Sequence, residues 1–219
     1  MKKYKIGILR VRTTEDSEIL NSHKKILMKY FPEFEIETRC IPNQYKGLYN
    51  QEAHDKALPD IISMAKDWEK DLDGLIISCA DDPGVDILKK ELSIPVVGAG
   101  ASAACLSVLH GLKTGVLGIE EDTPQSMKKV FGDRVVFYVK PEGVLSTNDL
   151  EIEEGKNAIL KSAYKLKKLG AEIITFACTG LSTMGAAKLI NEVGLPVVDG
   201  VIAEGIAMKG LLLSYYNKD

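Results

Sequence analysis

Short runs of aliphatic residues alternate along the chain with longer segments in which apolar residues recur at helical spacing. The aliphatic runs are continuous rather than alternating, which is typical of parallel strands covered on both faces. They predict strands at Lys5–Val11, Phe34–Ile41, Gly74–Ser78, Ile94–Val97, Thr114–Ile119, Val135–Val139, Ile173–Ala177 and Pro196–Val198. The segments between them predict helices at residues 16–30, 52–70, 85–91, 101–110, 124–131, 148–169, 184–193 and 202–216. Strands and helices in alternation predict an α/β fold with parallel sheet.

Several expected helix ends carry capping residues. Thr123 before Pro124 predicts an N-cap followed by proline at the first helical position. Asn148 with Glu151 predicts a capping box. Three glycines stand where helices should stop, at Gly111, Gly170 and Gly194.

The chain also repeats three landmarks in the same order. Residues 5–11 (KIGILRV) match residues 113–119 (KTGVLGI), residues 73–79 match 171–178, and residues 94–98 match 195–199. A period this long indicates duplication of a half-domain rather than a solenoid. We therefore expect two similar parallel-sheet α/β halves related by pseudo-twofold duplication, at residues 1–111 and 112–219, with a cleft between them. The C-terminal helix is free to pack back on the first half.

Two cysteines, Cys79 and Cys178, end equivalent strands in the two halves. Ligands of open parallel sheets bind beyond the carboxyl ends of the strands, which is where both thiols fall. Turn and helix-start residues follow each one, so backbone N–H groups should lower the pKa of each thiol below about 8.5. We interpret this pair as functional. Cys40, inside the strand at residues 36–41, and Cys105, inside an alanine-rich helix, are interpreted as packing groups.

Two thiols that face each other across a pseudo-twofold axis suit racemisation. A stereocentre must lose a proton from one face and regain one on the other, so two proton-transfer groups are needed on opposite sides. The sequence thus predicts Cys79 and Cys178 as acid and base of a cofactor-independent racemase or epimerase. No Cys/His cluster at zinc-site spacing is present, and we expect no metal.

Four stretches are similar to the aspartate/glutamate/hydantoin racemase superfamily: SCADDPG at 78–84, PVVG at 95–98, ACTG at 177–180 and PVVDG at 196–200. The resemblance covers nearly the whole chain through the duplicated landmarks. It implies two α/β halves with one catalytic cysteine each, no cofactor, and a homo-oligomer.

The Cys-x-x-Asp-Pro-Gly stretch looks like the hydantoin and allantoin racemase branch. Glutamate racemases tend to carry Asn-Thr after the first cysteine and Thr-His after the second, where this chain has Ala80-Asp81 and Thr179-Gly180. The resemblance thus implies a 5-substituted hydantoin or a related ureide as the substrate.

One stretch departs from that branch. Hydantoin racemases usually show Asn-Pro-Asn after the first strand, whereas residues 9–14 here are LRVRTT. Arg10 and Arg12 are either solvated loop charges or a clamp for a substrate carboxylate. A clamp would suit an amino-acid-like or carbamoylated acid, and would leave the two-thiol mechanism unchanged.

Other residues near the expected cleft are candidates for substrate binding. Backbone N–H groups of Thr179 and Gly180 could stabilise a developing enolate oxygen. Asp82 either holds a polar edge of the substrate or shapes the turn before Pro-Gly. Thr13 and Thr123 are the remaining candidates, and Asp199 either lines the cleft or caps the final helix.

Charge and composition narrow the partners. The chain has 28 basic and 31 acidic residues and a net charge of -3, which favours neither nucleic acid nor an anionic membrane surface. No apolar run approaches the roughly 20 residues of a membrane span, and the N-terminal one is too short for a signal peptide. We expect a cytoplasmic protein with a small-molecule substrate.

Four rival interpretations stay open. Residues 97–103 (VGAGASA) form a Gly-x-Gly-x-x-Ala turn with acidic residues about 20 positions on, as in dinucleotide sites, but the equivalent turn at 198–200 lacks these glycines. An aspartate-type amino-acid racemase or a maleate-isomerase-like enzyme would reuse the same scaffold, the latter with one thiol as a nucleophile. A two-lobed binding or sensor protein would leave both thiols incidental.

Overall fold

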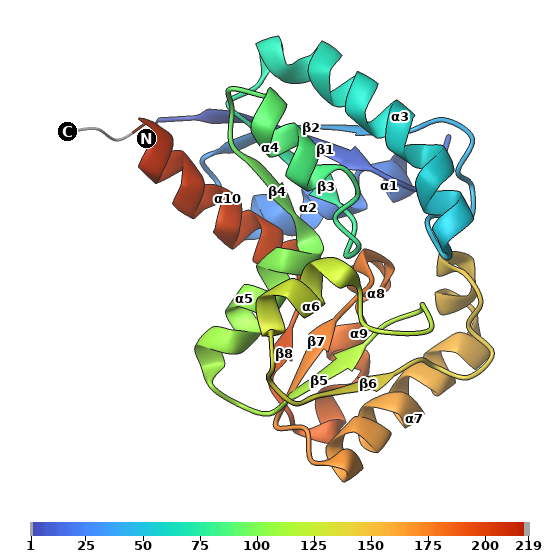
Figure 1. Ribbon diagram of the computed structural model, residues 1–219. Helices are drawn as coiled ribbons and strands as arrows, with labels where there is room; N and C mark the ends of the chain where they lie inside the picture. The colour runs from blue at the N-terminus through green and yellow to red at the C-terminus, as the bar shows by residue number, and fades with distance from the viewer. Residues whose placement is uncertain (1, 217–219) are drawn as a thin grey trace.

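The structure is a computed structural model that describes residues 2–216, and its two α/β halves lie one above the other (Figure 1). The first sheet has the order β2-β1-β3-β4 and the second has the equivalent order β6-β5-β7-β8, with every pair parallel. The strands are β1 (Tyr4–Arg10), β2 (Phe34–Cys40), β3 (Gly74–Ser78), β4 (Val96–Gly98), β5 (Thr114–Leu117), β6 (Val136–Val139), β7 (Ile173–Phe176) and β8 (Val197–Val198). The predicted fold class is confirmed.

Helices cover both faces of each sheet. They are α1 (Ser17–Leu20), α2 (Ser22–Tyr30), α3 (Gln51–Trp68), α4 (Val85–Glu91), α5 (Ala99–His110), α6 (Gln125–Phe131), α7 (Glu153–Leu169), α8 (Thr179–Thr183), α9 (Ala186–Leu189) and α10 (Gly200–Tyr216). Short 3-10 helices lie at η1 (Glu69–Asp71), η2 (Thr147–Leu150) and η3 (Asn191–Val193). Because both faces are covered, all five residues of β3 and all four of β7 are buried.

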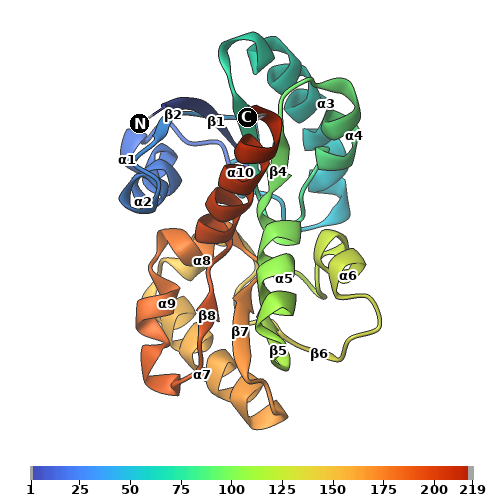
Figure 2. The ribbon, with the colours of Figure 1, turned by 90° about the vertical axis from the view of Figure 1, so that its left-hand side faces the viewer.

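The last helix of each half packs on the sheet of the other half. Helix α5 follows β4, but its Ala103 packs with Val116 of the second sheet. Helix α10 follows β8, but its Met208 packs with Ile6 of the first sheet. The two helices touch at the junction and extend from it over opposite halves (Figure 2), which ties the halves together.

The predicted helix at 16–30 is wrong in one respect, because it is two helices that meet at Asn21. The Arg10 guanidinium donates hydrogen bonds to the backbone carbonyls of Ile19 and Leu20. A charged side chain from β1 thus takes carbonyls that a continuous helix would use for its own ladder.

Helix starts in the second half also differ from the prediction. The capping box is formed by Ser146 and Asp149 at η2, rather than by Asn148 and Glu151, and α7 begins only at Glu153. Pro124 occupies the N-cap position of α6 in place of Thr123. The predicted helix at 184–193 is broken into α9 and η3, and α8 precedes it as a separate helix. The predicted stops are confirmed, with φ angles of 67° at Gly111, 99° at Gly170 and 74° at Gly194.

Candidate active site

The two cysteines predicted as a pair line the same cavity between the halves. Cys79 directly follows β3, and Cys178 is the N-cap residue of α8, two positions after β7. The Thr179 hydroxyl donates to the carbonyl oxygen of Ser78 at 3.3 Å, so a hydrogen bond joins the two cysteine-bearing segments directly. The cavity volume is about 40 Å³.

Burial raises the pKa of both thiols, so the expectation of lowered values is wrong. At Cys79 burial comes first, and the nearby Asp81 carboxylate raises the pKa further, well above its ordinary value. At Cys178 burial also raises the pKa, but N–H groups of Gly180 and Leu181 and the Thr147 hydroxyl oppose it. These donors stabilise a thiolate, so the negative charge forms more readily on Cys178 than on Cys79.

Two carboxyl groups, those of Asp81 and Glu120, also line the cavity. Burial raises the pKa of Asp81, and its Oδ2 lies 3.2 Å from Nε2 of His54. Burial and then the charge of Asp81 raise the pKa of Glu120 to about 7. The polar wall of the cavity is therefore acidic on this side.

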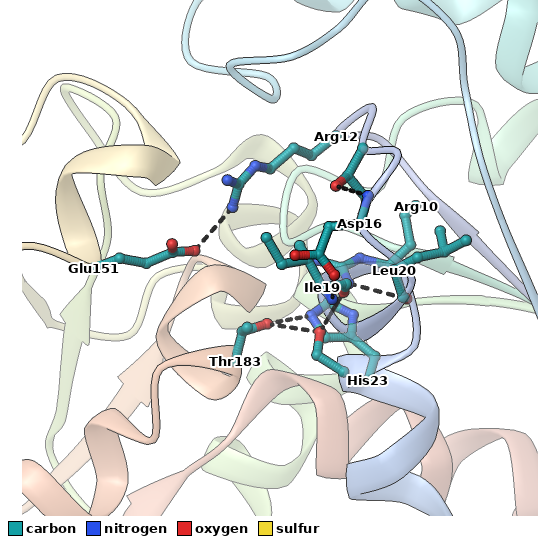
Figure 3. Close-up of polar contacts among 10 residues, drawn as sticks. Arg10, Arg12, Asp16, Ile19, Leu20, His23, Glu151 and Thr183 are labelled. Carbon is teal, nitrogen blue, oxygen red and sulfur yellow. Dashed lines mark hydrogen bonds and ion pairs between the residues drawn. The ribbon is translucent and has the colours of Figure 1, made fainter.

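Both arginines considered as a carboxylate clamp are held by other groups of the protein (Figure 3). Arg10 Nη1 donates to the Ile19 carbonyl at 2.6 Å and to Ser22 Oγ at 2.9 Å. Arg12 Nη1 forms an ion pair at 3.1 Å with Glu151 of the other half. Both residues line the cavity, yet both have structural partners.

The other candidate residues divide into two groups. Thr179 and Gly180 line the cavity, and the Gly180 N–H opposes the rise in the pKa of Cys178, so it acts on the thiolate. Thr13 is not among the cavity residues; it donates to the Ile41 carbonyl and so shapes the loop after β2. Thr123 lines an outer hollow of about 420 Å³ that adjoins the cavity.

Asp82 and Asp199, for which the sequence left two roles open, both cap the start of a helix. The Asp82 carboxylate accepts from the N–H groups of Gly100 and Ala101 at 2.7 and 2.8 Å, at the start of α5. Asp199 accepts in the same way from Val201 at the start of α10. Cys105, expected to be a packing group, is exposed.

A buried polar network next to Cys79 was missed by the sequence analysis. Ser78 Oγ donates to Glu204 Oε1 at 2.6 Å and lies 2.7 Å from Nδ1 of His23. His23 Nε2 in turn lies 3.0 Å from the Thr183 hydroxyl of the other half (Figure 3). Glu204 is a lone carboxylate in an otherwise apolar stretch of α10, which was a usable signal; His23 offered none.

The family model described as Asp/Glu/Hydantoin racemase matches residues 6–204. The chain belongs to this family. The family expected from the cysteine motifs is thereby confirmed.

Two curated members of the family are 28% identical to the chain. One is the hydantoin racemase of Pseudomonas sp. (strain NS671), matched over 165 residues, which are 67% of this chain and 61% of the relative. The other is the hydantoin racemase of Paenarthrobacter aurescens, matched over 158 residues, which are 66% of each protein. The match to both relatives spans slightly less than two thirds of their length.

Solved structures of the family share the fold. The allantoin racemase from Klebsiella pneumoniae aligns with a TM-score of 0.78 at 18% identity, over 96% of this chain and 88% of its own. The allantoin racemase from Pseudomonas fluorescens aligns with a TM-score of 0.78 at 19% identity, over 95% and 90%.

The glycine-rich turn that resembled a dinucleotide site has a packing role in this racemase-family chain. A Cβ atom at Gly100 would lie 1.9 Å from the Ala80 carbonyl oxygen, so only glycine allows α5 to approach the Cys79 segment. The N–H groups that would bind a pyrophosphate are bonded to Asp82. Within residues 2–216, no three His, Cys, Asp or Glu side chains are arranged to hold a metal ion. No helix in this part of the chain is long and apolar enough to cross a membrane.

Proposed function

We propose that the protein is a cofactor-independent racemase or epimerase of a 5-substituted hydantoin or a related ureide. Cys79 and Cys178 act as its opposed acid and base. The observation that carries the proposal is that both thiols, from equivalent strand ends of the two halves, line one cavity at the junction. That arrangement offers one proton-transfer group to each face of a stereocentre.

The two thiols account for both proton transfers of one turnover, and proton exchange with solvent then returns Cys178 to the thiolate. The Cys178 thiolate removes the proton from the stereocentre, and the electron pair of the C–H bond moves into the adjacent carbonyl to form an enolate. The Cys79 thiol then donates its proton to the opposite face of the same carbon. The product leaves with inverted configuration, Cys178 is a thiol and Cys79 a thiolate, and the opposite enantiomer reacts by the reverse sequence.

Charge at the cavity favours a neutral ring over an amino acid. The carboxyl groups of Asp81 and Glu120 line the wall, while Arg10 donates to backbone carbonyls and Arg12 uses one of its N–H groups on Glu151. A free carboxylate of aspartate or glutamate would lie beside these two carboxyl groups, and the ionised form of either group would disfavour it. A hydantoin places its acidic C–H next to a ring carbonyl without a neighbouring carboxylate, and the names of the hydantoin and allantoin racemases in the family point to the same substrate class.

Single substitutions of the two thiols test the mechanism. Cys79→Ser and Cys178→Ser should each lower racemisation by roughly 10²- to 10⁴-fold, because a hydroxyl has a far higher pKa than a thiol and near neutral pH neither gives up its proton nor supplies an anionic base. Racemisation is measured from the loss of optical rotation of single enantiomers of hydantoins, allantoin, aspartate and glutamate. Proton NMR in deuterium oxide follows the exchange of the stereocentre's hydrogen in the same samples.

Cys105→Ser is the matched control because its thiol is exposed and remote from the cavity. It should keep wild-type turnover, and all variants should keep the wild-type melting temperature. Substantial racemisation in both cavity variants would contradict the two-thiol mechanism. Turnover of aspartate or glutamate with none of any hydantoin would contradict the substrate class.

A further inference from the structure

The polar side chains of the cavity wall are nearly all occupied by partners within the protein. Those with at least one hydrogen-bond or ion-pair partner are Arg10, Arg12, Ser78, Asp81, Thr147 and Thr179. Glu120 differs from them: among the residues that the structure describes, none forms a hydrogen bond or ion pair with its carboxyl group. Both of its oxygens are available to accept a hydrogen bond from a bound molecule.

The position of Glu120 is nevertheless well defined. Its backbone carbonyl accepts a hydrogen bond of 2.6 Å from the Tyr138 hydroxyl, which fixes the segment after β5. Its side chain is half-buried and lies where the cavity meets the outer hollow, since both are lined by Asp81 and Glu120. Lys140, the cation whose charge lowers the pKa of Glu120, forms its ion pair with Glu121 instead, at 2.6 Å.

The internal repeat gives Glu120 a counterpart in the first half. The register that pairs Lys5 with Lys113 continues to pair Arg12 with Glu120, and both of these residues line the cavity. The two halves therefore present opposite hydrogen-bonding character at equivalent positions. Arg12 has five N–H donors and uses one of them on Glu151, while Glu120 offers only acceptors when ionised.

A hydantoin ring matches this asymmetry. Its stereocentre is bonded on one side to a carbonyl carbon and on the other to a ring nitrogen that carries a hydrogen. With one thiol on each face of the ring, the carbonyl and the N–H point within the ring plane to opposite sides. A donor at one of two equivalent positions and an acceptor at the other suit those two edges.

We infer that Glu120 is a substrate-binding residue whose carboxyl group accepts the ring N–H bonded to the stereocentre. The substrates are then cyclic ureides in which that nitrogen is unsubstituted. A carboxyl group keeps an acceptor oxygen in either protonation state, so the contact forms on both sides of neutrality. This inference rests on the proposed racemase activity and assigns one ring atom to one side chain.

Methylated substrates test the assignment atom by atom. The probes are 5-methylhydantoin, its derivative methylated on the nitrogen bonded to the stereocentre, and its derivative methylated on the nitrogen between the two carbonyls. They are compared on wild type and on Glu120→Met, which keeps a side chain of similar length without the acceptor. Glu121→Met is the matched control, because Glu121 is adjacent but exposed and points to Lys140.

In wild type and Glu121→Met, the first methylation should lower kcat/KM by about 10- to 100-fold, the worth of a hydrogen bond to a charged group. In Glu120→Met, kcat/KM for the parent hydantoin should fall by a similar factor relative to wild type. Methylation of the nitrogen bonded to the stereocentre should then lower kcat/KM by less than about threefold. The second methylation should change kcat/KM by the same factor in all three proteins.

Two results would overturn the inference. One is equal turnover by wild type of the parent and the first derivative. The other is a methylation penalty that persists in a folded Glu120→Met variant. If wild type racemises no hydantoin at all, the proposed function itself fails. That result is distinct from a racemase whose turnover is unchanged by methylation of the ring nitrogen, which would overturn only the role of Glu120.

Discussion

At the scale of single residues, the most unusual side chain is a carboxyl group with no access to solvent. Glu204 is completely buried, and its Oε2 has no hydrogen-bond partner between residues 2 and 216. Burial raises its pKa well above the ordinary value, against the opposing effects of the Ser78 hydrogen bond and the Arg10 charge. The protonated acid is therefore the form that the folded protein favours.

Glu204→Gln should remove a pH dependence of stability. A carboxyl group whose pKa is higher in the folded than in the unfolded chain stabilises the fold fully below the unfolded pKa of about 4.3. That contribution is lost as pH rises from there through the folded pKa. The free energy of unfolding, measured by urea titration at a series of pH values, should fall less steeply with pH in Glu204→Gln than in wild type.

A matched variant separates burial from the mere loss of a carboxyl group. Glu142 is exposed, so Glu142→Gln should follow the wild-type curve. Parallel curves for wild type and Glu204→Gln would show that Glu204 ionises as readily in the folded as in the unfolded chain.

At the scale of elements, the sequence predicted what local pattern and strand direction decide. The strands were predictable because their aliphatic runs are covered on both faces, and the thiols were placed together because carboxyl ends of parallel strands share an edge. The helix break at Asn21 was not predictable, because the Arg10 side chain that bonds to this segment comes from another element, β1. The Ser78–His23–Glu204 network was not predictable for the same reason, since its members come from three different elements, β3, α2 and α10.

Gly100→Ala tests the close approach of α5 to the Cys79 segment. The new Cβ would lie 1.9 Å from the Ala80 carbonyl, so backbone must move, at a cost of roughly 1–3 kcal/mol in the free energy of unfolding. Racemisation should fall as well, because Ala80 adjoins Cys79. Urea unfolding and kcat/KM measure the two effects.

Gly210→Ala is the control within the same kind of element. A Cβ at this exposed site in α10 has open space within 4 Å, so higher helix propensity should stabilise the protein by up to about 1 kcal/mol. Equal stability changes in the two variants would show that the contact at Gly100 relaxes at no cost.

At the scale of the whole molecule, the junction between the halves combines buried apolar packing with polar contacts around the cavity. The exchanged helices α5 and α10 pack through buried apolar side chains. Around the cavity the contacts are polar, including Arg12–Glu151 and Ser22–Thr183. The cavity of about 40 Å³ lies between these contacts, so they border any ring that it binds.

Breaking the Arg12–Glu151 ion pair should therefore alter binding more than stability. The Glu151 side chain is 44% exposed, and such pairs contribute at most about 1 kcal/mol, so the melting temperature of Glu151→Gln should stay near wild type. The ion pair also holds the two halves together around a bound substrate. Its loss should therefore raise KM by up to about fivefold with little change in kcat. Glu153→Gln, which breaks an exposed pair with Lys156 inside α7, should change neither constant. A large fall in melting temperature in Glu151→Gln, or an equal rise in KM in both variants, would mean that this ion pair does not act on substrate binding. The outcome expected here instead gives the ion pair across the cavity a role in holding substrate between the thiols.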